Sequence, residues 1–128
     1  MSAANASPRP TLLVVDDDLD VLLALSFVAE ARGFDVERCS TAGEAIALAR
    51  SGRRFSCLIV DQLLGDDRGI DVLAVLRSGG IETPAVVITT APSELLRRRA
   101  AAAGAPIVEK PLLDEMLFTE IERLMRTD

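Results

Sequence analysis

Charged residues follow short apolar runs at several places in this sequence, and their types suit phosphoryl transfer assisted by a metal ion. Asp16 and Asp17 follow one such run, Asp61 follows another, and Lys110, the only lysine of the chain, follows a third. Carboxylates that lie close together repel one another unless a cation joins them. Magnesium is the natural cation, because it prefers hard oxygen ligands. The chemistry indicated is transfer of a phosphoryl group to a carboxylate, which gives an acyl phosphate.

The carboxylates divide into one acceptor and several metal ligands. Asp61 stands alone at the end of its run, so we expect it to protrude as the phosphoryl acceptor and to share in metal binding. We expect Asp17 to bind Mg²⁺ directly and Asp16 to bind it largely through water. The backbone carbonyl of Leu63 is expected to complete the protein ligands.

Lys110 and Thr89 are expected to act on the phosphoryl group itself. The lysine ammonium approaches both Asp61 and a phosphoryl oxygen as a point charge, whereas an arginine is a wider planar fork. Thr89 ends an apolar run and would donate its hydroxyl to a phosphoryl oxygen. Taken singly, each residue has a plainer interpretation, since an Asp after a strand is more often a helix cap and a lone Thr or Lys is usually structural or solvated. We expect Asp18 to be that cap, which leaves the two preceding carboxylates without such a role.

These residues converge only if the apolar runs are parallel strands whose carboxyl ends share one edge of a sheet. The runs alternate with helical patterns from Thr11 onward. Strands are expected at residues 11–16, 34–39, 55–60, 85–89 and 107–109, helices at 19–32, 41–51, 70–78, 93–103 and 112–126, and a loop around Gly65 and Gly69. Strict alternation predicts an open, doubly wound parallel α/β sheet with right-handed crossovers and the strand order 2-1-3-4-5.

The composition excludes several functions. A chain of 128 residues with only 3% aromatic residues is expected to be one domain with an aliphatic core. The net charge of −6 argues against direct binding of nucleic acid. The chain has no histidine, which excludes His-based acid–base catalysis, so any phosphohistidine must come from another protein.

The termini and cysteines bear on the compartment. Residues 1–10 contain Ala, Ser and Pro without an apolar stretch, so we expect a disordered N-terminal tail and not a signal peptide. No apolar run reaches membrane-spanning length. Cys39 and Cys57 are expected to be buried free thiols on strands that flank the first strand from opposite sides. These features predict a soluble protein of the reducing cytoplasm, with no membrane partner.

The motifs together resemble the receiver domain of two-component response regulators, over residues 11–126. The matching elements are Leu-Leu-Val-Val before Asp16 and Asp17, Leu-Ile-Val before Asp61, Gly69, Pro84-Ala-Val-Val-Ile before Thr89, and Lys110-Pro111. The resemblance implies a flavodoxin-like (βα)5 fold, Asp61 as phosphoacceptor, a Mg²⁺ cofactor and a cis Lys110–Pro111 bond. It implies a sensor histidine kinase or a histidine phosphotransfer protein as phosphoryl donor. It also implies a phosphoacceptor with autodephosphorylation, not a turnover enzyme.

We therefore expect a single-domain response regulator that signals through protein contacts, since the chain ends soon after the last helix and leaves no room for a DNA-binding module. By the same resemblance, a downstream partner would dock on the face formed by residues 93–103, 107–109 and 112–126. Relay to a phosphotransfer protein is an open alternative. Arg97–Arg99 could belong to that docking face or be a solvated surface. The wide apolar stripe of the last helix leaves a homodimer open.

Several positions depart from the receiver pattern. Leu64 and Gly65 replace the usual Met-Pro, Thr90 replaces a small residue, and Ile107 replaces the aromatic residue used for switching. Phosphoacceptance should survive these changes, whereas the usual coupling between threonine and aromatic residue is left open. Leu63 and Thr90 are both expected to hinder an attacking water and to lengthen the life of the acyl phosphate.

Two other functions remain as alternatives at this stage. A degenerate receiver could act as an interaction module without phosphorylation, and Ile107 keeps that alternative open. A Mg²⁺-dependent phosphatase similar to the haloacid dehalogenase superfamily would use Asp16 and Asp18. Against it, Asp20 stands where that motif requires threonine, and the chain is short for the fold with a substrate cap.

Overall fold

The central feature of the computed structural model, which describes residues 9–110 and 115–126, is a parallel sheet. Its strands are β1 (Thr11–Val15), β2 (Asp35–Cys39), β3 (Cys57–Asp61), β6 (Ala85–Thr89) and β7 (Ile107–Glu109). Neighbouring strands follow the order β2-β1-β3-β6-β7. This is the predicted order 2-1-3-4-5; the labels of the last two strands are higher because a short hairpin, β4 (Leu63–Leu64) and β5 (Asp67–Arg68), intervenes.

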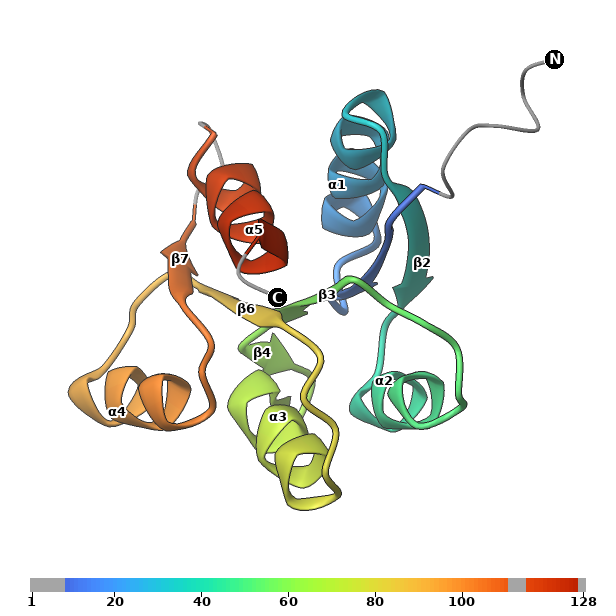
Figure 1. Cartoon of the computed structure of the whole chain (residues 1–128). Coiled ribbons are helices and arrows are strands. Elements are labelled where there is room, and N and C mark those ends of the chain that lie inside the picture. Colours follow the sequence, from blue (N-terminus) through green and yellow to red (C-terminus); the bar gives the residue numbers. More distant parts are fainter. Residues whose placement is uncertain (1–8, 111–114, 127–128) are drawn as a thin grey trace, which may run out of the picture.

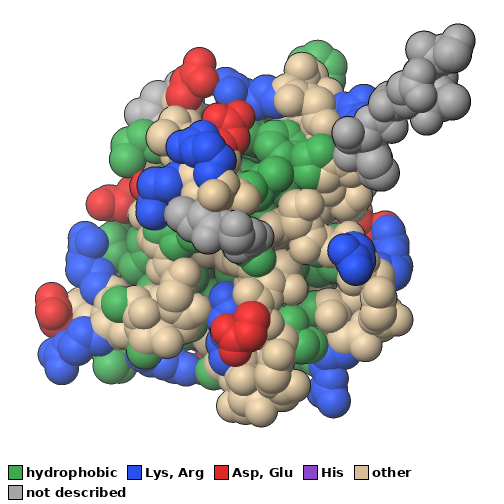
Figure 2. Space-filling view, viewed as in Figure 1, with side chains coloured by type: hydrophobic (Ala, Val, Ile, Leu, Met, Phe, Trp, Pro, Cys, Tyr) green, Lys and Arg blue, Asp and Glu red, His purple; other side chains and the backbone are tan. Residues whose placement is uncertain are grey.

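Helices cover both faces of the sheet, as a parallel sheet requires. They are α1 (Leu19–Ala31), α2 (Ala42–Ala49), α3 (Gly69–Ser78), α4 (Glu94–Ala102) and α5 (Met116–Arg126). α1 and α5 lie on one face and α2, α3 and α4 on the other (Figure 1). No helix in the described ranges is long and apolar enough to span a membrane. On the visible face of the molecule, basic and acidic side chains are interspersed (Figure 2).

Side chains of the central strands alternate between the two helical layers. In β1, Leu13 and Val15 belong to the core beneath α2, α3 and α4, whereas Leu12 and Val14 belong to the core beneath α1 and α5. The period of two residues follows from the pleat of a strand. Because both faces are covered, β1 and β3 are apolar at nearly every position, which is why continuous apolar runs identified them correctly.

The register of the sheet brings the strand ends together. Val15 is paired with Val60, so Asp16 and Asp61 follow on adjacent strands. Thr89 is paired with Glu109, and the next residue, Lys110, donates its backbone N–H to the Thr89 carbonyl at 2.9 Å. The predicted shared edge is therefore confirmed.

Helix starts follow local capping rules. The Asp18 carboxylate accepts hydrogen bonds from the backbone of Asp20 and Val21, so the prediction that Asp18 caps α1 is confirmed. At α2 the Thr41 hydroxyl accepts from the Glu44 N–H at 3.1 Å, and the Glu44 carboxylate accepts from the backbone N–H of residue 40. Two backbone amides at the start of α2 are thus held by side chains of its first turn and cap.

The cysteines lie as predicted. Cys39 ends β2 and Cys57 begins β3, both are buried and free, and β1 separates their strands. Burial raises the pKa of both thiols to about 12, and the charges of nearby glutamates add to the rise at Cys39. They are core side chains and not reactive groups.

The segment after β3 differs from the prediction of a plain loop. It forms a two-stranded antiparallel hairpin, β4 (Leu63–Leu64) and β5 (Asp67–Arg68). Gly65 takes a φ of 63° at the first position of the two-residue turn, a conformation that glycine adopts without strain. Leu64 is buried and anchors the hairpin in the core. Strands of two residues are too short to show a hydrophobic period.

The ends of the chain differ in detail from the expected boundaries. α5 begins at Met116, and Glu115 before it is not helical, so the helix expected from residue 112 starts later. Pro111 lies outside the described residues, and with it the expected cis Lys110–Pro111 bond. Of the expected tail, residues 1–8 also lie outside them, whereas Arg9 donates hydrogen bonds to the carbonyls of Glu30, Gly33 and Phe34.

Candidate phosphoacceptor and metal site

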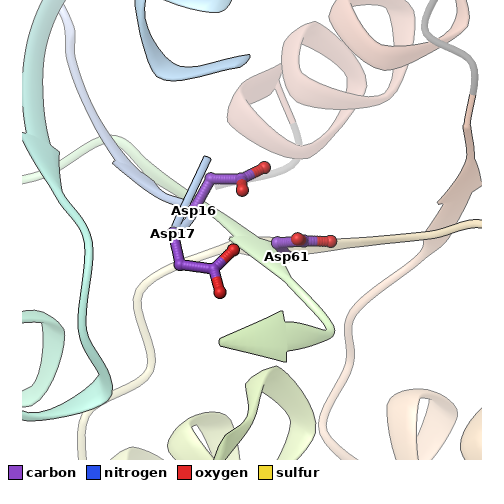
Figure 3. A group of neighbouring side chains, drawn as sticks. All are labelled: Asp16, Asp17 and Asp61. Carbon is purple, nitrogen blue, oxygen red and sulfur yellow. The ribbon is translucent and has the colours of Figure 1, made fainter. Parts of the chain in front are cut away.

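Three carboxylates gather at the carboxyl edge of the sheet. Asp16 and Asp17 follow β1, Asp61 ends β3, and one oxygen of each lies within 4.8 Å of the others. Figure 3 shows the Asp16 and Asp61 side chains reaching into the same space, with Asp17 beside them. Asp16 is 2% exposed and Asp61 is 6% exposed, whereas Asp17 is open to solvent. The predicted convergence of these three residues is what the structure shows.

Lys110 completes the charge arrangement. Its Nζ lies 3.3 Å from Asp61 Oδ1 and 3.6 Å from Asp16 Oδ2. One ammonium facing two buried carboxylates leaves a net negative charge, to which Asp17 adds. The site therefore has an excess of anionic charge that a further cation would balance.

Local hydrogen bonds orient the two aspartates after β1 differently. Oδ1 of Asp16 accepts from the backbone N–H of Asp18 at 2.9 Å. Oδ2 of Asp17 accepts from the Gly65 N–H, also at 2.9 Å, which ties the tip of the β4–β5 hairpin to the site. Each aspartate thus has one oxygen held by the backbone.

One buried carboxylate oxygen in the cluster has no hydrogen-bond donor among the described residues. Oδ2 of Asp16 is buried and has no hydrogen-bond partner among the residues described, and the Lys110 ammonium is 3.6 Å away. A buried carboxylate oxygen without a donor costs free energy. Oxygen ligands from three carboxylates match a hard dication, so this cluster could hold a metal ion and its composition suits Mg²⁺.

The same crowding acts on Asp61. Burial raises the pKa of the Asp61 carboxyl above its ordinary value, and the charge of Asp16 raises it further, whereas Lys110 lowers it in part. A carboxylate must be ionised to attack phosphorus. A bound dication would favour that ionised form.

Thr89 and Leu63 lie at the margin of the cluster. Thr89 ends β6 and is buried, and its hydroxyl accepts from the Ala91 N–H at 3.4 Å. Leu63 begins β4 two residues after Asp61, and its side chain is 54% exposed. The roles of the Thr89 hydroxyl and the Leu63 carbonyl stay predictions.

Gly69 belongs to the site through its lack of a side chain. A Cβ on Gly69 would lie 2.4 Å from the carbonyl oxygen of Asp61 and 2.8 Å from Val60 Cγ1. Its φ is not positive, so the requirement is close approach and not backbone conformation. Gly69 was one of the residues that match the receiver pattern, but the sequence does not show that it lies against the Asp61 backbone. Gln62, which the sequence analysis did not single out, also contacts this glycine, through its backbone carbonyl.

The fold and the cluster define a class, and comparison with known proteins identifies it. The response regulator receiver domain matches residues 12–122, and the chain belongs to this family. Receiver domains are generally phosphoacceptors in two-component signal transduction, bind Mg²⁺ at the acidic pocket and interact with histidine kinases or phosphotransfer proteins. The family assignment removes the dehalogenase-like phosphatase from consideration, in agreement with the use of Asp18 as a helix cap.

Similar curated proteins are transcriptional and stress regulators. The acid tolerance regulatory protein ActR of Sinorhizobium medicae is 35% identical over 118 residues, which are 91% of this chain and 60% of that protein. The transcriptional regulatory protein FixJ of Rhizobium meliloti is 32% identical over 114 residues, 88% of this chain and 55% of that protein. The chain thus spans a little over half the length of these relatives.

Similar solved structures are receivers. The crystal structure of FixJ-N is 30% identical with a TM-score of 0.82, covering 94% of this chain and 96% of that one. The chemotaxis protein CheY4 of Vibrio cholerae is 27% identical with a TM-score of 0.81, covering 91% of this chain and 99% of that one. These matches confirm the doubly wound (βα)5 fold.

Proposed function

We propose that this chain accepts a phosphoryl group on Asp61 in a Mg²⁺-dependent reaction and passes on a signal through protein contacts. The observation that carries the proposal is the position of the Lys110 ammonium, 3.3 Å from Asp61, beside three carboxylates that could hold a dication. The donor would be the phosphohistidine of a sensor histidine kinase or of a histidine phosphotransfer protein. The chain itself has no histidine to supply one.

The proposed Mg²⁺ ligands are oxygen atoms of the three aspartates and of one backbone carbonyl. Asp17 and Asp61 would bind Mg²⁺ directly, Asp16 would bind it largely through water, and the Leu63 carbonyl would complete the protein ligands. When bound, Mg²⁺ offsets charge on the transferring group. The orphaned oxygen of Asp16 supports this assignment.

The proposed transfer step uses an oxygen lone pair of Asp61. That lone pair forms the new O–P bond while the N–P bond to the donor imidazole breaks, and the bonding electrons remain on the imidazole. Lys110 and Thr89 donate hydrogen bonds to phosphoryl oxygens as the group moves. The product is an acyl phosphate on the end of β3.

Exposed apolar residues beside the pocket suit the approach of a donor protein. Leu19, Leu23 and Phe27 recur every fourth residue along α1, and Phe27 is 76% exposed. A depression of about 420 Å³ next to this helix is lined by Asp17, Leu19 and Leu23 among others. A donor that reaches Asp61 would cover this surface, and burial of these side chains would contribute to affinity.

The proposed output face consists of α4, β7 and α5. A groove of about 470 Å³ runs between these elements, and Ala100, Ile107 and Leu124 lie in its lining with Arg97 and Arg123. Arg97 of α4 also lies 4.0 Å from the Glu109 carboxylate of β7, so that part of this face is a solvated ionic surface. A downstream protein, a phosphotransfer protein or a second copy of the chain are the candidate partners there.

Mass spectrometry tests the proposal directly. The parent chain incubated with acetyl phosphate and Mg²⁺ should gain the mass of one phosphoryl group, and Asp61→Asn should gain none. Asp35→Asn is a matched control, because Asp35 is an exposed carboxylate that pairs with Arg9 at the other edge of the sheet. If the parent gained no mass in the presence of Mg²⁺, the chain would instead be a receiver that acts as an interaction module without phosphorylation.

A further inference from the structure

Helix α3 begins without the usual local cap. Arg68 occupies the N-cap position, and its side chain makes no capping hydrogen bond in the part of the chain that the structure describes. The first two amides of the helix are nevertheless satisfied, both by Gln62. The Gly69 N–H donates to the Gln62 carbonyl, and the Ile70 N–H donates to Gln62 Oε1, each at 2.9 Å. Gln62 therefore caps a helix that starts several residues later.

Gln62 is also bound to the sheet. Its own N–H donates to the carbonyl of Ile88 in β6 at 2.9 Å. The residue directly after the phosphoacceptor is thus joined to β6 on one side and to the start of α3 on the other. The hairpin of residues 63–68 is closed into a ring at Gln62 and Gly69, and its tip is tied to Asp17 through the Gly65 N–H.

The close approach of α3 to the acceptor makes this cap sensitive to position. Gly69 lies so near the backbone of Asp61 that a Cβ would meet the Asp61 carbonyl at 2.4 Å. A shift of the start of α3 would therefore press on the residue that carries the phosphoryl group, or loosen the backbone around it. The hydrogen bonds from Gly69 and Ile70 to Gln62 join the start of α3 to the residue after Asp61 at this point of close approach.

The type of side chain also matters. A helix N-terminus favours an acceptor with negative charge, yet a glutamate at position 62 would add a carboxylate directly after Asp61 in a chain whose site already has an excess of anionic charge. Glutamine supplies the accepting oxygen without charge, so it caps α3 without adding to the repulsion in the pocket.

We infer that Gln62 is a positioning residue: by capping α3 it holds the backbone of Asp61 and Leu63 in the arrangement that metal binding and phosphoryl transfer require. The chemical part of this inference rests on the proposed function. The capping part stands on the three hydrogen bonds of Gln62 and the contact of Gly69.

The test compares Gln62→Met, which keeps the length of the side chain and removes the acceptor, with Gln62→Glu, which keeps an accepting oxygen. Thr41→Ala is the matched control, because it removes a cap of α2, which carries none of the pocket residues. Hydrogen exchange of the Ile70 amide, the Mg²⁺ dissociation constant by calorimetry and the rate of phosphorylation by acetyl phosphate are measured well below each unfolding temperature.

In Gln62→Met the Ile70 amide should exchange roughly fivefold faster or more, as expected for the loss of one helix cap. The Mg²⁺ affinity and the phosphorylation rate of this variant should each fall by a similar factor. Gln62→Glu should restore the protection of Ile70. Thr41→Ala should lose as much thermal stability as Gln62→Met and keep the parent's Mg²⁺ affinity and rate.

If the Ile70 amide exchanged in Gln62→Met at the parent's rate, the claim that Gln62 caps α3 would be overturned. The Ile70 amide could exchange faster in Gln62→Met while its Mg²⁺ affinity and phosphorylation rate equal those of Thr41→Ala. That result would overturn the positioning role and leave the proposed function intact. A parent that neither binds Mg²⁺ nor gains a phosphoryl group would overturn the proposed function, and the positioning role with it.

Discussion

The Lys110 ammonium lies 3.3 Å from the Asp61 carboxylate, although β6 separates the strands from which the two residues extend. The lysine side chain therefore reaches across the end of β6, where Thr89 lies buried. Placed this way, the ammonium can contact both Asp61, the proposed acceptor, and a phosphoryl group transferred to it. The first prediction follows from this geometry.

Replacing Lys110 with arginine should slow phosphorylation. The guanidinium keeps the charge, but it is wider and planar, so it cannot approach Asp61 and a phosphoryl oxygen as a compact ammonium does. We expect the initial rate of phosphorylation by acetyl phosphate and Mg²⁺ to fall roughly tenfold or more. Intact-mass spectrometry over time measures that rate. The reciprocal change Arg123→Lys, at an exposed residue of α5, should leave the rate unchanged. A Lys110→Arg rate within twofold of the parent would contradict the point-charge role.

Asp61→Asn should stabilise the metal-free protein at neutral pH. Because the pKa of Asp61 is raised in the folded state, its contribution to stability is present below the ordinary carboxyl pKa and is lost as pH rises through the folded pKa. Asparagine carries no charge, so the variant does not lose this stability at neutral pH. We expect its free energy of unfolding to exceed that of the metal-free parent by ~1 kcal/mol, the size of one like-charge contact.

Urea unfolding at pH 7 with a chelator measures this gain, and two conditions should diminish it. At pH below the ordinary carboxyl pKa the parent is also neutral at position 61, so the two proteins should converge. With Mg²⁺ present, binding stabilises the folded parent by mass action. A variant less stable than the metal-free parent at pH 7 would show that the carboxylates do not repel one another as described.

Gly69→Ala should destabilise the protein, because the new Cβ would lie 2.4 Å from a backbone oxygen that cannot move aside easily. We expect a loss of about 2 kcal/mol in the free energy of unfolding, typical of overpacking. Gly43→Ala is the matched control, since a Cβ there meets nothing within 4 Å and Gly43 lies inside α2. That variant should gain roughly 0.5–1 kcal/mol from helix propensity. Equal effects of the two substitutions in urea unfolding would refute the close-approach argument.

Leu63→Asn should shorten the life of the acyl phosphate. Leu63 is exposed beside the acceptor, and an apolar side chain there cannot hydrogen-bond an attacking water, whereas a carboxamide can. We expect decay of the phosphorylated mass to accelerate by roughly an order of magnitude, which is less than the about 10²–10⁴-fold typical of a positioned general acid or base. Val75→Asn, an exposed apolar residue of α3, serves as control. Slower decay in Leu63→Asn than in the parent would count against the shielding role.

The two cysteines should stay unreactive in the folded protein. Burial raises their pKa to about 12, so few thiolates form at pH 8. A thiol reagent should modify none of them in buffer and both in urea. Because the raised pKa values stabilise the fold below the unfolded value of 9.0, this contribution should decline between about pH 9 and pH 12. Rapid labelling of folded protein at pH 8 would contradict the burial of both residues.

Much of the site could be predicted from the sequence, because the central strands β1, β3 and β6 are largely apolar runs that end at, or just before, a candidate site residue. Asp16, Asp61 and Thr89 follow or end such runs, and parallel pairing aligns those ends whatever the details of the loops. The boundary of β3 was the weak point, since Phe55 and Ser56 precede the strand and Asp61 belongs to it.

The β4–β5 hairpin and the cap of α3 were beyond sequence reasoning for physical reasons. Two strands of two residues carry no period, and their pairing depends on the burial of Leu64. Capping signals are sought next to the helix start, whereas Gln62 is close to α3 only after the hairpin has formed. Contacts that depend on tertiary folding leave no local pattern.

The contacts of Arg9 have a practical consequence. Its guanidinium donates hydrogen bonds to three carbonyls in the last turn of α1 and just after it, and the Pro10 carbonyl accepts from the Asp35 N–H, so the chain enters the fold beside the beginning of β2. The acidic cluster lies past the opposite ends of these strands. A surface tether joined at this point of the chain would lie a strand length away from Asp61, so immobilising the protein there would leave the candidate site open to a phosphoryl donor.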